Sequence, residues 1–292
     1  MTKESGLVIK GFGELFEVLT ESGEKISCAV RGSLKHKSSL PLAGDRVLFE
    51  RQASGKAVID TVCERKNFLI RPPMANLDKL FIVVATASPL PSFETLDKIT
   101  CSATAKGIEP IIVINKTDIK SSDEIREIYE KASIKIYDVC ANKGSGIEAL
   151  RSEISGICAF AGASGVGKSS LMNALFPSLH LTVGDLSDKS DRGKHTTRTV
   201  ELFEVDGGYF ADTPGFAMID FEKFDFIKLS ELSSSFPEFK QHITKCRYTD
   251  CTHTSEDGCG IITALENGII SQSRYKSYLA FYETLKNKRE YH

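Results

Sequence analysis

Several features are missing from this sequence of 292 residues. Its longest apolar runs, such as "LFIVVATA" at 80–87, are far shorter than a membrane span, and "MTKESGLVIKGFGE" at 1–14 has no apolar stretch of the signal-peptide type. No internal repeat or low-complexity tract occurs, and the hydrophobic fraction of 41% and charged fraction of 26% are typical of a globular protein. We therefore expect a cytoplasmic protein of two or three domains that does not associate with membranes.

A strong net charge and a disulfide framework are missing as well. The formal net charge is −2, so any contact with nucleic acid would have to come from local basic patches. Three of the eight cysteines lie close together beside a histidine, whereas the others follow no pattern: Cys28, Cys63, Cys101, Cys140 and Cys158. This cysteine usage predicts a reducing compartment and one metal site.

The hydrophobic pattern changes twice along the chain. In residues 1–70, apolar residues recur at every second position between turn signals, which predicts a small closed β-barrel, and "RPP" at 71–73 is typical of a linker. From 71 to 226, buried strands alternate with amphipathic helices, which predicts a parallel sheet covered by helices on both faces. Residues 227–292 are first Ser-rich, then carry Cys and His, and are finally helical, as expected of a small C-terminal unit.

The middle part yields specific expectations for its elements. Strands are predicted at 79–87, 109–115, 134–139 and 157–162. Helices are predicted at 92–107, with Ser92 as the cap, and at 122–133, 146–155 and 168–176. The segments "TVELFEV" and "YFADTPG", joined by "DGG", predict a hairpin at one edge of the sheet.

The stretch "GASGVGKSS" at 162–170 fits the phosphate-loop pattern G-x-x-x-x-G-K-[ST], and it follows an apolar strand and opens a helix, as that loop requires. Its glycines let successive backbone N–H groups converge on phosphate oxygens, where the helix N-terminus adds positive potential. Lys168 would reach the β- and γ-phosphates and the Ser169 hydroxyl would bind Mg²⁺. The plainer alternative is a Gly-rich turn without a ligand. The predicted phosphate-site residues are Gly162, Ala163, Ser164, Gly165, Val166, Gly167, Lys168, Ser169 and Ser170.

The sequence "NKTD" at 115–118 predicts recognition of guanine. Asp118 can accept from the N1–H and 2-amino groups of guanine, and adenine offers no such pair of donors. Asn115 would tie this loop to the phosphate loop, and the aliphatic stem of Lys116 would cover the face of the base. Behind the next strand, a backbone N–H of "CAN" at 140–142 would donate to guanine O6. The predicted base-site residues are Asn115, Lys116, Thr117, Asp118, Cys140, Ala141 and Asn142.

The sequence "DTPG" at 212–215 completes the predicted nucleotide site. Asp212 would hold Mg²⁺ through water, and the Gly215 N–H would meet the γ-phosphate. The polar loop "DRGKHTTR" at 191–198 offers Thr196 or Thr197 as a second Mg²⁺ hydroxyl, and the sequence does not choose between them. The alternative for this stretch is a plain surface loop.

The base loop precedes the phosphate loop here, the reverse of the usual GTPase order. In an open parallel sheet, ligand loops gather at the carboxyl ends of the strands, so a site depends on where its loops lie in space. Domain termini often lie close together, and joining them while reopening the chain elsewhere preserves the fold. We therefore interpret the segments as one site of a circularly permuted GTPase. As a hypothesis, a γ-phosphate-dependent movement at Gly215 would reorient the C-terminal unit, which follows it directly in the chain.

The clustered cysteines form the pattern C-x4-C-x-H-x5-C with Cys246, Cys251, His253 and Cys259. Three thiolates and one imidazole satisfy a closed tetrahedral zinc site, with no open position for catalysis. Because so small a unit has little core, the metal is expected to supply much of its stability. The alternative is a set of reduced cysteines near a surface histidine.

Taken together, the reordered motifs, the leading barrel and the trailing Cys/His cluster resemble the ribosome small subunit-dependent GTPase A family, known as RsgA, YjeQ or YloQ. The resemblance implies an OB-fold at 1–70, a circularly permuted P-loop GTPase domain at 71–226 and an α-helical zinc-binding domain at 227–292. It implies GTP and GDP as substrate and product, Mg²⁺, and one structural Zn²⁺. It also implies late maturation of the small ribosomal subunit, contact with its rRNA and stimulation of hydrolysis by that subunit. We expect a monomer.

The residue after "DTPG" is Phe216, where Ras-type enzymes place a Gln that orients the attacking water. Phe cannot hydrogen-bond water, which predicts slow hydrolysis by the isolated protein. His195, beside Thr196 and Thr197, is the local candidate for orienting water, and the alternative is a solvated loop residue. The predicted catalytic set is therefore His195, Lys168, Thr196, Thr197 and Gly215.

Two basic stretches are candidates for contact with RNA. One barrel loop carries Arg31, Lys35, His36 and Lys37, and the C-terminal helix would present Lys286, Lys288 and Arg289 outward. The alternative for the barrel loop is a solvated turn. Two rival functions are an rRNA-binding module that uses GTP as a timing ligand, and an ATP-using P-loop kinase, against which "NKTD" argues.

Overall fold

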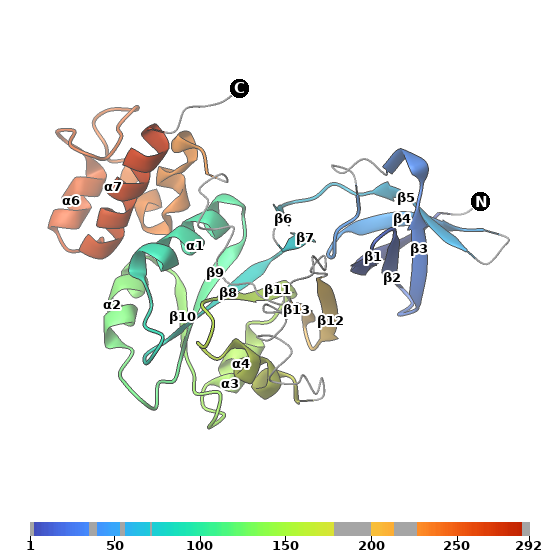
Figure 1. The fold of residues 1–292 in the computed structure, drawn as a ribbon. Helices are drawn as coiled ribbons and strands as arrows, with labels where there is room; N and C mark the ends of the chain where they lie inside the picture. Colours follow the sequence, from blue (N-terminus) through green and yellow to red (C-terminus); the bar gives the residue numbers. More distant parts are fainter. Residues whose placement is uncertain are drawn as a thin grey trace. The chain divides into compact units, whose positions relative to one another are not determined.

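The computed structural model describes residues 3–34, 40–52, 56–70, 72–177, 200–212 and 227–287. The chain divides into two compact units, each of which is considered by itself (Figure 1). The first unit comprises Met1–Lys79, Glu153–Phe160 and Phe176–Phe216. The second comprises Leu80–Ser152, Ala161–Leu175 and Ala217–His292.

The first unit begins with a closed five-stranded barrel, as the period-two pattern predicts. Its strands are β1 (Glu4–Phe12), β2 (Leu15–Thr20), β3 (Lys25–Val30), β4 (Arg46–Arg51) and β5 (Ala57–Val62), and a short 3-10 helix, η1 (Gly32–Leu34), follows β3. Neighbours run in the order β1-β2-β3-β5-β4, and an antiparallel pairing of β1 with β4 closes the circle. Alternate side chains such as Val8, Val18, Phe49 and Ile59 point inward and are fully buried.

Two hairpins complete the first unit. Strands β6 (Phe68–Ile70) and β7 (Pro73–Ala75) pair antiparallel, and Pro73 of the stretch predicted as a linker is the first residue of β7. Strands β12 (Glu201–Val205) and β13 (Gly208–Asp212) form the second hairpin, and β13 runs parallel to β11 (Gly156–Ala161). The predicted hairpin is present, and β12 pairs on its other side with β1, where Lys10 lies opposite Glu201.

The second unit contains strands β10, β9 and β8 in that order, with β9 and β10 parallel. The strands are β8 (Lys79–Ala85), β9 (Glu109–Asn115) and β10 (Lys135–Asp138), and the helices are α1 (Phe93–Ala105), α2 (Asp123–Lys131), α3 (Ile147–Ser152) and α4 (Lys168–Leu175). Almost all of β8 and β9 is buried, as expected of strands covered on both faces. Figure 1 shows α3 and α4 on the opposite side of these strands from α1 and α2.

The helix ends follow local chemistry. Ser92 caps α1 as predicted, because its Oγ accepts from the Thr95 N–H at 3.4 Å. The helix predicted at 146–155 ends earlier, at Ser152. After this helix, the Lys79 ammonium donates a hydrogen bond to the carbonyl oxygen of Glu153 at 2.6 Å. Gly156, with a φ of 69°, then begins β11.

The C-terminal part of the second unit is helical and shares its core with α1. It consists of the 3-10 turns η4 (Leu229–Glu231), η5 (Ser233–Ser235) and η6 (Pro237–Phe239) and the helices α5 (Lys240–Ile243), α6 (Gly260–Glu266) and α7 (Gln272–Lys286). Phe236, Phe239 and Phe281 are almost fully buried in this core, together with Cys101 of α1. Within the described ranges, no helix is long and apolar enough to span a membrane.

A buried ionic network also joins α7 to α1. Arg274 of α7 is 0% exposed, and its guanidinium donates to both carboxylate oxygens of Glu238, at 2.7 and 3.1 Å. It also donates to Asp97 Oδ1 at 2.8 Å and to Thr100 Oγ1 at 2.9 Å, both on α1. The Tyr129 hydroxyl of α2 donates to the same Asp97 oxygen at 2.7 Å. The network therefore connects three helices and η6 within one unit.

Candidate nucleotide and metal sites

The phosphate loop links β11 to α4. Gly162, Gly165 and Gly167 have φ values of 141°, 82° and 101°, a backbone region that favours glycine. A Cβ atom at Gly162 would lie 2.2 Å from the carbonyl oxygen of Val83, so close backbone approach also requires glycine there. The other residues predicted for the loop lie along the same turn and the start of α4: Ala163, Ser164, Val166, Ser169 and Ser170.

Asn115, the last residue of β9, joins three segments that are distant in the sequence. Its Nδ2 donates to the carbonyl oxygen of Val166 at 3.0 Å, and its Oδ1 accepts from the Ala141 N–H at 3.2 Å. The side chain is only 3% exposed. A Cβ atom at Gly167 would lie 2.2 Å from Asn115 Nδ2, which shows how closely the loops approach. One buried amide thus holds the base loop, the phosphate loop and the 140–142 loop together.

Lys116 and Thr117 strengthen this junction. Lys116 has a φ of 62°, and its ammonium donates to the carbonyl oxygens of Gly165 at 3.0 Å and Ser88 at 2.7 Å. Its charged end is therefore tied to the phosphate loop. The Thr117 hydroxyl donates to the carbonyl oxygen of Val139 at 3.1 Å.

Asp118 lies at the outer end of the base loop with 27% of its side chain exposed, and the Lys143 ammonium lies 3.2 Å from its Oδ2. Hydrogen bonds from Cys140 and then from Lys143 hold the pKa of Asp118 below its usual value. The carboxylate is therefore ionised and able to accept from two donors. The Cys140 N–H donates to the carbonyl oxygen of Ser145 at 3.0 Å, and Asn142 lies in the turn between them.

The Lys168 side chain folds back over the phosphate loop. Its ammonium donates to the carbonyl oxygens of Gly162 at 2.7 Å and Ala163 at 2.8 Å. Burial lowers the pKa of Lys168 to about 8, and no carboxylate among the described residues offsets the desolvation of its charge. An incoming phosphate would supply the missing negative charge, so the loop is suited to an anion.

Part of the predicted nucleotide site lies outside the described residues. This holds for His195, Thr196, Thr197, Gly215 and Phe216. Asp212 is the last residue of β13, and its side chain is also outside the described part of the chain. Their predicted roles in binding Mg²⁺ and in hydrolysis remain predictions.

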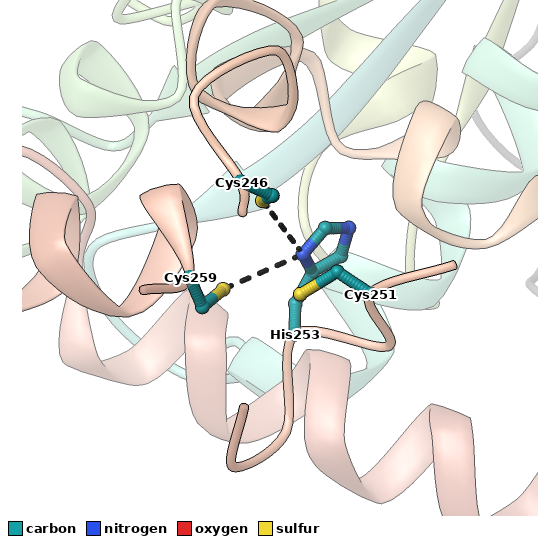
Figure 2. Close-up of side chains that lie close together, drawn as sticks. All are labelled: Cys246, Cys251, His253 and Cys259. Atoms are coloured by element: carbon teal, nitrogen blue, oxygen red, sulfur yellow. Dashed lines mark hydrogen bonds between the residues drawn. The ribbon is translucent and has the colours of Figure 1, made fainter. Parts of the chain in front are cut away.

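The four predicted zinc ligands come together in the C-terminal part. The ligand atoms of Cys246, Cys251, His253 and Cys259 all lie within 4.8 Å of one another. Figure 2 shows the three sulfur atoms gathered around the imidazole, whose Nδ1 lies 3.6 Å from Cys246 Sγ and 3.5 Å from Cys259 Sγ. Usual Zn–S and Zn–N bond lengths give a nitrogen–sulfur edge of about 3.6 Å in a tetrahedral site. The donor atoms therefore fit Zn²⁺.

The surroundings also suit a metal site. His253 is 3% exposed, and burial lowers its pKa, which favours the neutral imidazole that binds metals. The Gly260 N–H donates to Cys246 Sγ at 3.3 Å and so supports charge on that sulfur. Burial alone would raise the pKa of Glu256, but hydrogen bonds from Thr252 and from backbone amides outweigh it and hold that pKa at about 2. A permanent carboxylate thus lies beside the ligand loop.

Three of these residues were not predicted from the sequence. Lys143 directly follows "CAN" in the sequence, and this adjacency is only a weak sign that it lies beside the base site. Glu256 lies between the histidine and the last cysteine of the metal motif, where an acidic residue resembles any surface residue. Ser88 contributes only its carbonyl oxygen, for which no sequence signal exists.

The predicted RNA-contacting residues are only partly described. The Arg31 side chain is 49% exposed and pairs with Glu50 at 3.1 Å and with Asp60, so two carboxylates share its charge. Lys286 lies 5.6 Å from the Tyr282 ring centroid and is exposed, as predicted. The remaining basic residues lie outside the described part of the chain: Lys35, His36, Lys37, Lys288 and Arg289.

Comparison with known proteins shows which family has this arrangement of domains. Residues 5–59 match the RsgA N-terminal domain and residues 62–222 match the RsgA GTPase domain. A protein of Halalkalibacterium halodurans named small ribosomal subunit biogenesis GTPase RsgA is 37% identical over 292 residues, covering 98% of each chain. A Thermotoga maritima protein of the same name is 38% identical over 297 residues, covering 99% of each.

Two solved structures are similar over the whole chain. YjeQ from Thermotoga maritima gives a TM-score of 0.82 at 35% identity, covering 99% of this chain and all 100% of that one. YloQ, described as a circularly permuted GTPase, gives a TM-score of 0.81 at 30% identity, covering 99% and 98%. The predicted fold class is confirmed: a permuted GTPase with an N-terminal OB-like barrel and a C-terminal helical part that carries the Cys/His cluster.

Proposed function

This chain belongs to the RsgA family of circularly permuted GTPases and is a GTP-hydrolysing enzyme, and we propose that it acts in the late maturation of the small ribosomal subunit. The support is that relatives covering its full length are named small ribosomal subunit biogenesis GTPases. We further propose that it works as a monomer in the cytoplasm. In this proposal 1–70 contacts rRNA, 71–226 binds and hydrolyses GTP, and 227–292 binds zinc.

The junction at Asn115 is the observation that carries the nucleotide site. Its two hydrogen bonds bring the base loop and the phosphate loop to one place, so that a single nucleotide would reach both. In our proposal the ionised Asp118 accepts from guanine N1–H and the 2-amino group, and an amide of residues 140–142 donates to O6. Lys168 then exchanges its two carbonyl partners for the β- and γ-phosphates.

Ser169 and Asp212 would hold Mg²⁺, which neutralises charge developing on the β- and γ-phosphates during hydrolysis. The chain's own contribution is to position the phosphates through the 162–168 loop and to orient water through His195. Because Phe216 replaces the usual Gln, we expect slow hydrolysis until the small subunit completes the site. His195→Ala should lower the subunit-stimulated rate by about 100-fold or more while leaving GDP affinity unchanged.

The deciding experiment measures GTP hydrolysis by the purified protein titrated with small ribosomal subunits, with large subunits and Lys168→Ala as controls. We expect low turnover alone and strong stimulation by small subunits only. Fast turnover that small subunits leave unchanged would contradict the proposal. Subunit binding that depends on the nucleotide, with hydrolysis unaffected in single turnovers, would instead indicate an rRNA-binding module that uses GTP as a timing ligand.

For the C-terminal part, we propose one structural Zn²⁺ bound by Cys246, Cys251, His253 and Cys259. The observation that supports it is that the four ligand atoms lie within 4.8 Å of one another, with two nitrogen–sulfur distances of 3.6 and 3.5 Å that match a tetrahedral zinc site. With four protein ligands the ion would have no open position, so its contribution is stability and not chemistry. Metal analysis of the purified protein should give one zinc per chain, and each ligand substitution should reduce that content.

A further inference from the structure

The backbone at His253 has an unusual conformation. Its φ is 60°, in the left-handed region, which a residue other than glycine adopts only when its surroundings hold it there. This conformation turns the imidazole toward the sulfur atoms, so that Nδ1 lies 3.5 Å from Cys259 Sγ. Something must hold the loop from Thr252 to Ser255 in this shape.

One carboxylate binds the amides on both sides of His253. Oε1 of Glu256 accepts from the Thr252 N–H at 2.7 Å, and Oε2 accepts from the Thr254 N–H at 3.0 Å. The Ser255 N–H donates to the same Oε2 at 3.1 Å, and the Thr252 hydroxyl donates to Oε1. An ionised carboxylate has enough acceptor sites for all four donors, and such charge-assisted bonds are strong.

Two tyrosines of α7 bind the carbonyl groups of the same loop. The Tyr278 hydroxyl donates to the carbonyl oxygen of Thr252 at 2.7 Å, and the Tyr275 hydroxyl donates to that of His253 at 2.9 Å. Both rings are buried, at 2% and 9% exposure. Both carbonyl groups that flank His253 along the backbone, those of Thr252 and His253, are therefore anchored on α7, and the amides of Thr252 and Thr254 are anchored on Glu256.

We propose that Glu256 is a positioning residue for the metal site: it shapes the loop so that His253 presents Nδ1 to the metal before the metal binds, and the α7 tyrosines complete the clamp. The inference rests on the proposed zinc site and adds a role for residues that bind no metal themselves. Outer groups that orient a metal-binding histidine typically contribute 10- to 100-fold in metal affinity.

The test uses full-length protein in the variants Glu256→Ala, Glu256→Gln and Asp257→Ala. Asp257 is the matched control, because it is adjacent and its side chain is 90% exposed. Zinc affinity is measured by competition with a chelator, and Co²⁺ substitution reports the ligands through its visible absorption. We expect Glu256→Ala to bind zinc about 10- to 100-fold more weakly, with a Co²⁺ spectrum like that of His253→Ala. Asp257→Ala should match the unsubstituted protein.

Glu256→Gln keeps one oxygen that accepts from one side of the loop and replaces the other oxygen with an amide NH2 group, which cannot accept, so it should recover part of the affinity. Tyr275→Phe removes only the hydroxyl on the His253 carbonyl and should weaken binding by a few-fold. This milder variant keeps the test available if Glu256→Ala folds poorly. A double-mutant cycle then separates positioning from general loop stability, because Glu256→Ala should cost nothing further once His253 is alanine.

The outcomes are distinct. If the unsubstituted protein binds neither Zn²⁺ nor Co²⁺, both the zinc site and the clamp are wrong. If it binds them with three sulfur ligands and one nitrogen while Glu256→Ala behaves like Asp257→Ala, only the clamp is wrong. An affinity loss with an unchanged Co²⁺ spectrum, or an equal loss in the His253→Ala background, would also overturn the positioning role.

Discussion

Arg274 is the residue whose replacement should most disturb the docking of the C-terminal helices on α1. Asp97 and Glu238 depend on its guanidinium, and their side chains are 0% and 3% exposed. Asp97 would retain only the Tyr129 hydroxyl on its Oδ1, because its Oδ2 has no hydrogen-bond partner among the described residues. Arg274→Met retains much of the length and apolar volume while it removes the charge and all five donors.

The size of the effect follows from the burial. Burial itself disfavours the charged guanidinium, and the attraction of Glu238 and Asp97 outweighs it, so that the pKa of Arg274 lies well above its usual value. Removing one partner from such a buried ion pair costs about 3–5 kcal/mol, because the other partner remains buried and uncompensated. For a unit of this size, 1 kcal/mol corresponds to about 2–4 °C in Tm, so Arg274→Met should lower the Tm of the second unit by roughly 6–20 °C.

Calorimetry of the zinc-loaded full-length protein at pH 7 measures this change in Tm. Arg274→Lys keeps the positive charge but cannot form the bidentate contact, so its Tm should lie between those of Arg274→Met and the unsubstituted protein. Arg247→Met is the matched control, because Arg247 and Asp257 form a pair that is 64% and 90% exposed, and such a pair contributes little. A loss under about 1 kcal/mol at pH 7 would refute this account of the network.

Three further predictions concern the nucleotide site. Asp118→Asn should shift preference from guanine to xanthine nucleotides in a competition assay, and unchanged preference would place the base elsewhere. Gly167→Ala should abolish nucleotide binding, because its Cβ would lie 2.2 Å from Asn115 Nδ2 at a φ of 101°; normal affinity would contradict the geometry. GDP affinity should be constant below pH 8 and fall up to tenfold per unit above it, since the pKa of Lys168 is about 8 without an anion and is raised by bound phosphate. Lys168→Ala should lose the fall in GDP affinity above pH 8. An unchanged pH profile of GDP affinity in this variant would contradict the assignment of that fall to Lys168.

The local features of this protein could be predicted because their causes are local. The bounds of β9 at Glu109–Asn115 match the strand predicted from its buried apolar run. The four metal ligands follow from donor chemistry and short spacing, and the structure brings them together. The order of the nucleotide motifs was interpretable because each motif carries its own geometry within a few residues.

The long-range features could not be predicted. The contacts of Arg274 reach across 36 residues to Glu238 and 177 residues to Asp97, and sequence patterns place an arginine at the surface. The pairing of β12 with β1 likewise depends on the meeting of Lys10 and Glu201, and hairpin signals do not specify what lies beside a hairpin. Glu256 was missed because its function depends on the fold of a loop that its own hydrogen bonds shape.

The Arg274 network constrains how the nucleotide could act on the C-terminal helices. Circular permutation changes the order in which the chain connects its segments, and the hydrogen bonds of Asn115 between the loops can still form. One result of the new order is that the helices from Ile227 onward follow the "DTPG" segment in the sequence. Those helices share a buried core and an ion-pair network with α1. Turning them relative to α1 would break buried pairs at about 3–5 kcal/mol, and a ligand shifts such an equilibrium only by its difference in affinity for the two states. A response to GTP that preserves the network must therefore move α1 and the C-terminal helices together, which favours displacement of a rigid body over reorientation of the C-terminal part alone.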